Sequence, residues 1–145
     1  MTGNFPTVSL RRRLAALVYD AIAVTAVVYF AAFVPVLASG GEALAPGNPL
    51  FALYLLMVIF AYFAISWRRG RTLGMQAWKL EIVDLQGSRP NGRAVALRFF
   101  SAGIALALGG LGYLVALLDR ERRTWPDRWS GTRLVPRDFN ACDGS

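Results

Sequence analysis

Histidine is absent from this chain, and cysteine occurs once, at Cys142. Without histidine, the chain lacks the commonest general base and the commonest metal ligand of proteins. A catalytic triad or a Cys–His pair is therefore excluded, and a single cysteine forms no internal disulfide. The acidic residues also lack the spacing of metal ligands. We therefore expect no enzymatic activity, no metal site and no cofactor.

Acidic residues are scarce, because nine Asp and Glu face sixteen basic residues, of which fifteen are Arg. Such an excess would suit anionic lipid or nucleic acid, or it would follow from the positive-inside rule in a small membrane protein. The basic residues border long apolar blocks and are not interleaved with aromatic residues as in a single-strand binder. This pattern favours a protein surrounded by the lipid bilayer, with no nucleic-acid partner.

Apolar residues are abundant, at 55% of the chain, and they gather into blocks at residues 14–38, 50–67 and 99–118. The first two blocks are long enough to cross a hydrocarbon core of about 30 Å as helices. The loop between them, residues 39–49, carries one Glu and no Lys or Arg, whereas arginines precede the first block and follow the second. By the positive-inside rule, both basic flanks are cytoplasmic, and so is the N-terminus.

The third apolar block conflicts with this rule, because a tail with six arginines follows it. A full crossing would place the basic tail outside. A break near residues 109–112, which include three glycines, would instead give a re-entrant pair of short helices and return the tail to the cytoplasm. Ser101, Ala105 and Gly109 also share one helical face, and this small-residue stripe would let another helix approach closely.

Residues 72–92 differ in character from the apolar blocks. Thr72 suits the N-cap of a short helix, and residues 79–84 alternate polar and apolar side chains as a strand does. The expected fold class is an all-α membrane protein: a small helical bundle of about three apolar segments with a short cytoplasmic strand or loop element. Residues 8–136 would form the membrane domain, and residues 1–7 and 137–145 would be polar tails.

One acidic residue, Asp20, lies inside the first apolar block. A carboxylate at membrane depth costs on the order of 2.5–3.5 kcal/mol, so it is expected to have a partner or a function. Arg13 shares its helical face, and Arg98 precedes the third block as a second candidate partner. Asp20 is either a titrating carboxylate on a cation or proton path or a packing group in an interhelical hydrogen bond or ion pair. Arg13 is either its partner or, beside Arg11 and Arg12, a snorkelling topology anchor.

Four segments occur in order along the chain: RLAALVYD at 13–20, GRTLGM at 70–75, LEIVDLQG at 80–87 with Arg98 downstream, and WPDRWSGT at 125–132. Together they resemble the RDD family of small bacterial membrane proteins, which is named for one Arg and two Asp. By position, the resemblance assigns the family-motif and ion-path residues as Arg13, Asp20 and Asp127, with Arg98, Gly70 and Gly74 in support. Pro126 stands where the family often has His, so a proton relay through that residue is excluded.

The resemblance implies a multi-pass protein of the bacterial inner membrane, with ion or proton transport as a suggested activity. We therefore hold two functional expectations. One is cation or proton transport through an intramembrane Asp–Arg pair, with Asp127 at the cytoplasmic mouth. The other is a non-transporting scaffold or accessory that binds a membrane partner or anionic lipid. Three apolar segments cannot enclose a pore, so a homo-oligomer or another membrane protein is also an expected partner. Asp127 could also cap a helix or accept hydrogen bonds from Arg122 or Arg123.

Overall fold

The computed structural model of the chain describes residues 6–42, 45, 47–120 and 123–139, so Cys142 and Arg122 lie outside the described residues. The elements follow one another as α1 (Leu10–Ala38), α2 (Pro49–Arg68), α3 (Leu73–Ala77), β1 (Leu80–Asp84), α4 (Gly92–Ala107), α5 (Leu111–Leu118), α6 (Trp125–Ser130), β2 (Thr132–Pro136) and a 3₁₀ turn at Arg137–Phe139. The fold is therefore mostly helical with two short strands.

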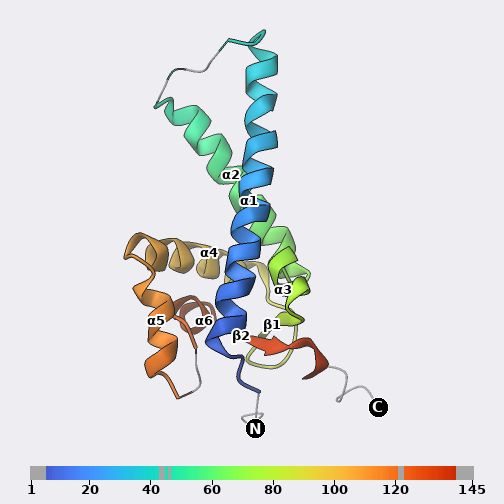
Figure 1. The fold of residues 1–145 in the computed structure, drawn as a ribbon, viewed down its shortest axis with the longest axis vertical. Coiled ribbons are helices and arrows are strands. Elements are labelled where there is room, and N and C mark those ends of the chain that lie inside the picture. Colours follow the sequence, from blue (N-terminus) through green and yellow to red (C-terminus); the bar gives the residue numbers. More distant parts are fainter. Residues whose placement is uncertain (1–5, 43–44, 46, 121–122, 140–145) are drawn as a thin grey trace.

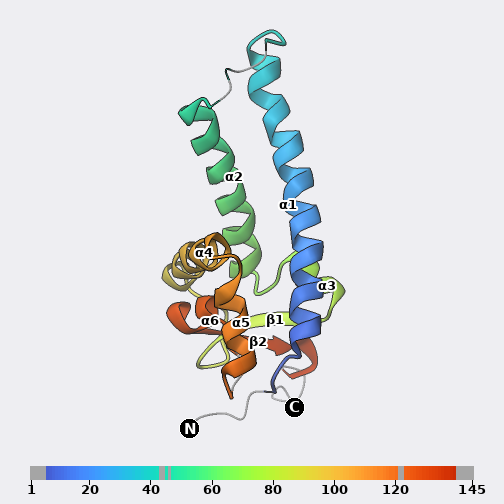
Figure 2. The same cartoon turned by 60° about the vertical axis from the view of Figure 1, so that its left-hand side comes forward.

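Helices α1 and α2 form a long hairpin, and all the shorter elements gather at one end of it (Figure 1). We call this group of elements, α3 to β2, the base. The view in Figure 2 shows the same division between hairpin and base. Among the described residues, α1 and the stretch Pro49–Ala77 that begins with α2 are the segments long and apolar enough to cross a membrane. They correspond to the first two predicted apolar blocks.

The hairpin buries little of its apolar surface within the chain. The buried residues of α1 are Arg13, Ala16 and Asp20, all in its first half, and α2 buries Trp67 near its end. Apolar side chains elsewhere face outward, as at Phe30, which is 70% exposed. A helix pair in a soluble domain would bury an apolar stripe, whereas extensive exposed apolar surface marks a site of membrane or protein contact.

The third apolar block is broken, as one of its two predicted arrangements requires. Helix α4 ends at Ala107, and Gly109 and Gly110 then take φ angles of 70° and 82°. This left-handed region favours glycine, so the two residues turn the chain before α5 begins. Both views show α4 lying across the hairpin and not along it (Figures 1 and 2). A third segment that crosses as a single helix is therefore absent from the described part of the chain.

Strand β1 confirms the strand predicted at residues 79–84, and it pairs with β2 in an antiparallel sheet. The central pair sets Ile82 opposite Leu134, both of which are buried. The fold is therefore mostly helical as expected, and the expected short strand or loop element is half of a small two-stranded sheet. The strand Thr132–Pro136 was not predicted, because its pairing depends on a partner some fifty residues earlier in the chain.

A small core lies where the sheet meets the start of α1 and the end of α2. It is formed by Val8, Ala16, Trp67, Met75, Leu80, Ile82, Val95 and Leu134. Of the predicted small-residue stripe, Ser101 and Ala105 are buried, whereas Gly109 lies in the exposed turn after α4. A Cβ atom on Gly112 of α5 would lie 2.4 Å from the Cβ of Ala105, so the stripe lets α5 approach α4.

Candidate functional site

Asp127 is positioned by the first turn of α6. The preceding Thr124 is the N-cap, and its backbone N–H donates to Asp127 Oδ2 over 3.1 Å. A carboxylate three residues after a threonine N-cap satisfies an otherwise unpaired amide of the first turn. The predicted capping role of Asp127 is therefore confirmed. The same geometry turns the carboxylate, which is 0% exposed, toward the interior of the base.

Two arginines from separate helices bind the Asp127 carboxylate. Arg13 Nη1 of α1 donates to Oδ2 over 2.6 Å, and Arg98 Nη1 of α4 donates to Oδ1 over 2.5 Å. Arg98 Nη1 also donates to Thr132 Oγ1 of β2 over 2.7 Å. Arg123, a predicted partner of Asp127, instead lies 4.0 Å from Asp119. One carboxylate thus joins α1, α4 and α6 through charge-assisted hydrogen bonds.

The charges around Asp127 keep it ionised. Burial raises the pKa of this carboxyl, but the guanidinium groups of Arg98 and Arg13 outweigh burial and lower the pKa to about 2. The cluster therefore holds two cations and one anion at neutral pH. We call Arg13, Arg98 and Asp127 the charge clamp.

Asp20 is held separately from the clamp, seven residues after Arg13 on α1, and by neutral donors. Thr72 Oγ1 donates to Asp20 Oδ2 over 2.5 Å, the Gly74 amide donates to Oδ1 over 2.9 Å, and the Tyr62 hydroxyl lies 3.5 Å from Oδ1. Asp20 is 3% exposed. It therefore ties α1 to α2 and to the start of α3.

The two motif glycines, Gly70 and Gly74, allow the close packing of α1, α3 and β1. Gly70 follows α2 with a φ angle of 83°, and its carbonyl accepts from the Ile82 amide over 2.6 Å. A Cβ atom on Gly74 would lie 2.1 Å from the carbonyl oxygen of Ala16, so only glycine lets α3 approach α1 closely enough to donate to Asp20. Thr72 caps α3 as predicted, since its hydroxyl accepts from the Met75 amide over 3.2 Å.

The structure therefore regroups the predicted site residues. Arg13 and Arg98 were candidate partners of Asp20, but both bind Asp127. Side chains of a helix lean toward its N-terminus, so Arg13 extends away from Asp20. Arg13 does not snorkel outward either, because it is only 7% exposed. The predicted Asp20–Arg13 pair is thus replaced by two separate sets of contacts.

Three partners were not identified from the sequence as members of the site: Tyr62, Thr132 and, except as a cap, Thr72. A signal existed for Tyr62, because a hydroxyl within an apolar block is a natural partner for a carboxylate at the same depth. Thr132 offered no local signal, since its role depends on the position of a strand that was not predicted.

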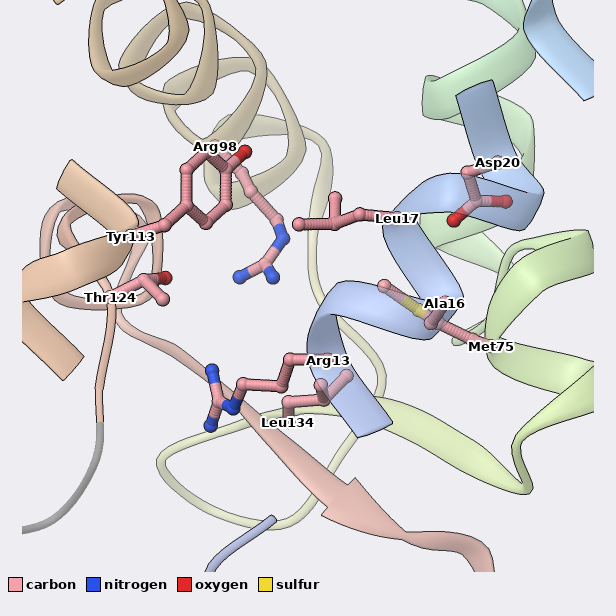
Figure 3. A pocket seen from close by; sticks show the side chains of 9 residues that line it. All are labelled: Arg13, Ala16, Leu17, Asp20, Met75, Arg98, Tyr113, Thr124 and Leu134. Carbon is pink, nitrogen blue, oxygen red and sulfur yellow. The ribbon is translucent and has the colours of Figure 1, made fainter. Parts of the chain in front are cut away.

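A cavity of about 40 Å³ separates the two sets of contacts (Figure 3). It is lined by Arg13, Ala16, Leu17, Asp20, Met75, Arg98, Tyr113, Thr124 and Leu134. Arg13 and Arg98 extend into it from α1 and α4, as Figure 3 shows. The guanidinium carbon of Arg98 also lies 5.5 Å from the ring centre of Trp67, a cation–π contact. No group of three or more His, Cys, Asp or Glu that could hold a metal ion occurs in the described ranges.

Comparison with known proteins confirms the resemblance seen in the sequence. The family model that matches the chain is described as the RDD family, and it covers residues 7–131. No curated protein and no solved structure matches the chain. The matched range contains every residue of the charge clamp and every partner of Asp20 described above.

Proposed function

The chain belongs to the RDD family, and from this premise we propose that it is a multi-pass protein of the bacterial inner membrane that acts as a non-transporting scaffold or accessory. Family membership and the two long apolar helices support a membrane location. The observation that carries the proposed role is that both family aspartates are bound by donors from other elements. The two aspartates stabilise the contacts between helices, and the two long helices anchor the base at the membrane.

In the proposed topology, α1 and α2 cross the bilayer and the base is cytoplasmic. The distribution of arginine supports this orientation, because Arg11, Arg68, Arg69 and Arg93 all belong to the hairpin's base end or to the base itself. The loop at the far end carries Glu42 and no basic residue. The positive-inside rule then assigns the arginine-rich end to the cytoplasm.

Helices α4 and α5 would lie in the cytoplasmic interface of the membrane. Their exposed side chains are large and apolar, as at Phe100, Leu106, Leu114 and Leu118. A helix that lies across the spans and exposes an apolar face can bury this face at the boundary between headgroups and acyl chains. This arrangement resolves the conflict over the basic tail, since the tail never crosses.

The surroundings of Asp20 favour a structural role, in which it joins α1 to α2 and α3, over a role in cation transport. A carrier carboxylate must release its protein partners to bind a cation, and Asp20 accepts from Thr72 and Gly74, which also cap and position α3. The other charged side chains that line the adjacent cavity are Arg13 and Arg98, which repel cations. Cation or proton transport is therefore the weaker of the two expected functions.

A membrane partner would bind the outer half of the hairpin. Tyr29, Phe30 and Phe33 are exposed there, and the ring of Tyr29 contacts the other two, with centroids 5.8 Å from Phe30 and 5.1 Å from Phe33. Rigid aromatic groups exposed on a helix suit contact with a further membrane helix. The partner would be a second copy of the chain or another membrane protein.

The test is a flux assay on purified protein in sealed vesicles with an imposed pH gradient. We expect no cation or proton flux above that of empty vesicles, and no difference between the wild-type protein and the Asp20→Asn variant. A Glu42→Gln variant, altered in the far loop, serves as the matched control. Flux that the wild-type and Glu42→Gln proteins support, and that a folded Asp20→Asn protein does not, would overturn the proposal.

A further inference from the structure

The charge clamp leaves one buried hydrogen-bond donor, Nε of Arg13, without a partner in the described part of the chain. Arg13 is 7% exposed and donates through Nη1 to Asp127, while its Nε is buried with no partner among the described residues. Arg98 also uses Nη1, toward Asp127 and Thr132. A guanidinium carries five N–H donors, and buried donors of native proteins are almost always met by protein, water or an ion. The unpartnered Nε–H of Arg13 therefore points to a ligand in the adjacent cavity, which Arg13 and Arg98 both line.

The charge around the cavity selects the sign of this ligand. Two guanidinium groups face one Asp127 carboxylate, so the clamp has one positive charge in excess. Asp20, the acidic residue that lines the cavity, is engaged by Thr72 and Gly74. Tyr113 and Thr124 add hydroxyl groups to the cavity wall. An anion with several acceptor oxygens fits these surroundings better than a cation does.

We propose that this cavity binds the oxyanion of a phosphate group, held by Arg13 and Arg98. The planar fork of a guanidinium matches phosphate oxygens in a bidentate geometry, which a lysine cannot reproduce. A single water needs about 10–15 Å³ of cavity volume. The cavity of about 40 Å³ therefore admits a group larger than one water. The phosphate is either that of an anionic lipid or free in solution.

The position of the cavity favours a lipid as the source. It lies at the junction of hairpin and base, beside α5, whose exposed leucines would rest in the membrane interface. Leu17, 36% exposed, gives the cavity an apolar wall on the side of α1. The assignment of a lipid as the source rests on the proposed scaffold function and its membrane topology. The oxyanion site itself rests on the charge clamp alone.

The test compares two lysine substitutions in the full-length protein. Arg13→Lys keeps the positive charge beside Asp127 but removes the guanidinium fork, and Arg11→Lys makes the same change at an exposed position of the same helical turn. Each protein is released from nanodiscs of phosphatidylcholine with or without phosphatidylglycerol, and native mass spectrometry counts the lipids retained. In parallel, the melting temperature in zwitterionic detergent is measured with and without inorganic phosphate.

We expect one retained phosphatidylglycerol on wild-type and Arg11→Lys proteins, and roughly tenfold weaker retention on Arg13→Lys, the effect of losing one charge-assisted hydrogen bond. If inorganic phosphate raises the melting temperature of wild type and Arg11→Lys but not of Arg13→Lys, and no lipid is retained, the site takes free phosphate. Equal behaviour of the two lysine variants, or neither retention nor a shift, overturns the proposal and leaves water in the cavity.

A second variant covers the case in which Arg13→Lys fails to fold. Leu17→Trp would fill the cavity from α1 without altering the charge clamp, and it is expected to lower retention similarly. Normal retention by folded Leu17→Trp would contradict the proposed position. Failure of the oxyanion site would leave the flux assay unaffected, so the two proposals fail independently.

Discussion

The two family aspartates differ in what binds them, although both are buried. Asp127 is bound by two guanidinium cations, so its negative charge is needed. Asp20 is bound by two hydroxyl groups and one amide, which are neutral, so its acceptor oxygens are needed more than its charge. Replacing each acid by its amide therefore separates the two roles.

At Asp20 we expect the amide to replace the acid almost fully. Asp20→Ala leaves the Thr72 hydroxyl and the Gly74 amide without an acceptor, and it should lower the free energy of unfolding by about 3 kcal/mol. Asp20→Asn retains an acceptor for Gly74 and should cost less than about 1 kcal/mol. Thermal unfolding in detergent measures both, with the exposed Thr25→Ala of the same helix as control. Equal losses for Ala and Asn would mean that the charge matters.

At Asp127 we expect that an amide cannot replace the acid. Asp127→Asn leaves Arg13 and Arg98 buried without a counter-charge, a change that typically costs about 3–5 kcal/mol. The same unfolding measurement tests this expectation. A loss as small as that of Asp20→Asn would show that the clamp contributes nothing through charge.

Acid should weaken the clamp over a defined range of pH. The folded pKa of Asp127 is about 2, below the unfolded value near 3.9, so its stabilisation is complete above about pH 4 and is lost as the pH falls through about 2. The amount is on the order of 2 kcal/mol. Chemical unfolding at pH 5 and pH 2.5, followed by tryptophan fluorescence, should show this loss in the wild type and in Glu42→Gln. A loss of equal size in Asp127→Asn would assign the effect to other groups.

Among the elements, α3 is the one whose position is most narrowly determined. It is only five residues long and is attached to α1 through Asp20 and through the close approach at Gly74. A helix this short is not stable alone, so its position depends on these contacts. Substitution of Gly74 therefore tests whether α3 is held in place by its contacts with α1.

Gly74→Ala should displace α3 from α1. The added Cβ would meet the backbone carbonyl of Ala16 at 2.1 Å, and backbone cannot yield as a side-chain end can. We expect a loss of unfolding free energy of about 2 kcal/mol or more. Gly103→Ala in α4, where a Cβ meets nothing within 4 Å, should be neutral or stabilising by up to about 1 kcal/mol. Equal melting temperatures for the two variants would contradict the close approach.

The elements that the sequence predicted are those with local signals. The two apolar helices, the Thr72 cap, strand β1 and the break after α4 each depend on neighbouring residues or on composition. Strand β2 and the partners of Asp127 could not be predicted, because they depend on contacts between distant parts of the chain. Arg13 and Asp127, for example, are 114 residues apart. The proximity of Arg13 and Asp20 in sequence therefore suggested a pair that the fold does not form.

At the scale of the whole molecule, a two-helix hairpin is joined to the base by the small apolar core and by a few buried polar contacts. The hairpin contributes Arg13 and Asp20, and the base contributes Arg98, Asp127 and Thr72 to Gly74. Together with the packing of Ala16 and Trp67 in the core, these contacts determine how the base is oriented on the hairpin. The proposed topology combines this arrangement with the gathering of arginines at the base end.

Cysteine labelling tests the topology directly. In a Cys142→Ser background, Arg137→Cys near the end of the base should react with a membrane-impermeant reagent only after the inner membrane is permeabilised. Glu42→Cys in the far loop should react in spheroplasts with an intact membrane. If both positions react without permeabilisation, the third block crosses the membrane and the base is not cytoplasmic as a unit.

The central claim is that Arg13 is coupled to Asp127 and not to Asp20, and double-mutant cycles measure this directly. One cycle combines Arg13→Gln with Asp127→Asn, and the other combines Arg13→Gln with Asp20→Asn, with unfolding free energies measured under identical conditions. We predict a coupling energy of about 1.5 kcal/mol or more in the first cycle and less than about 0.5 kcal/mol in the second. A large coupling between Arg13 and Asp20, with none between Arg13 and Asp127, would contradict the arrangement described here.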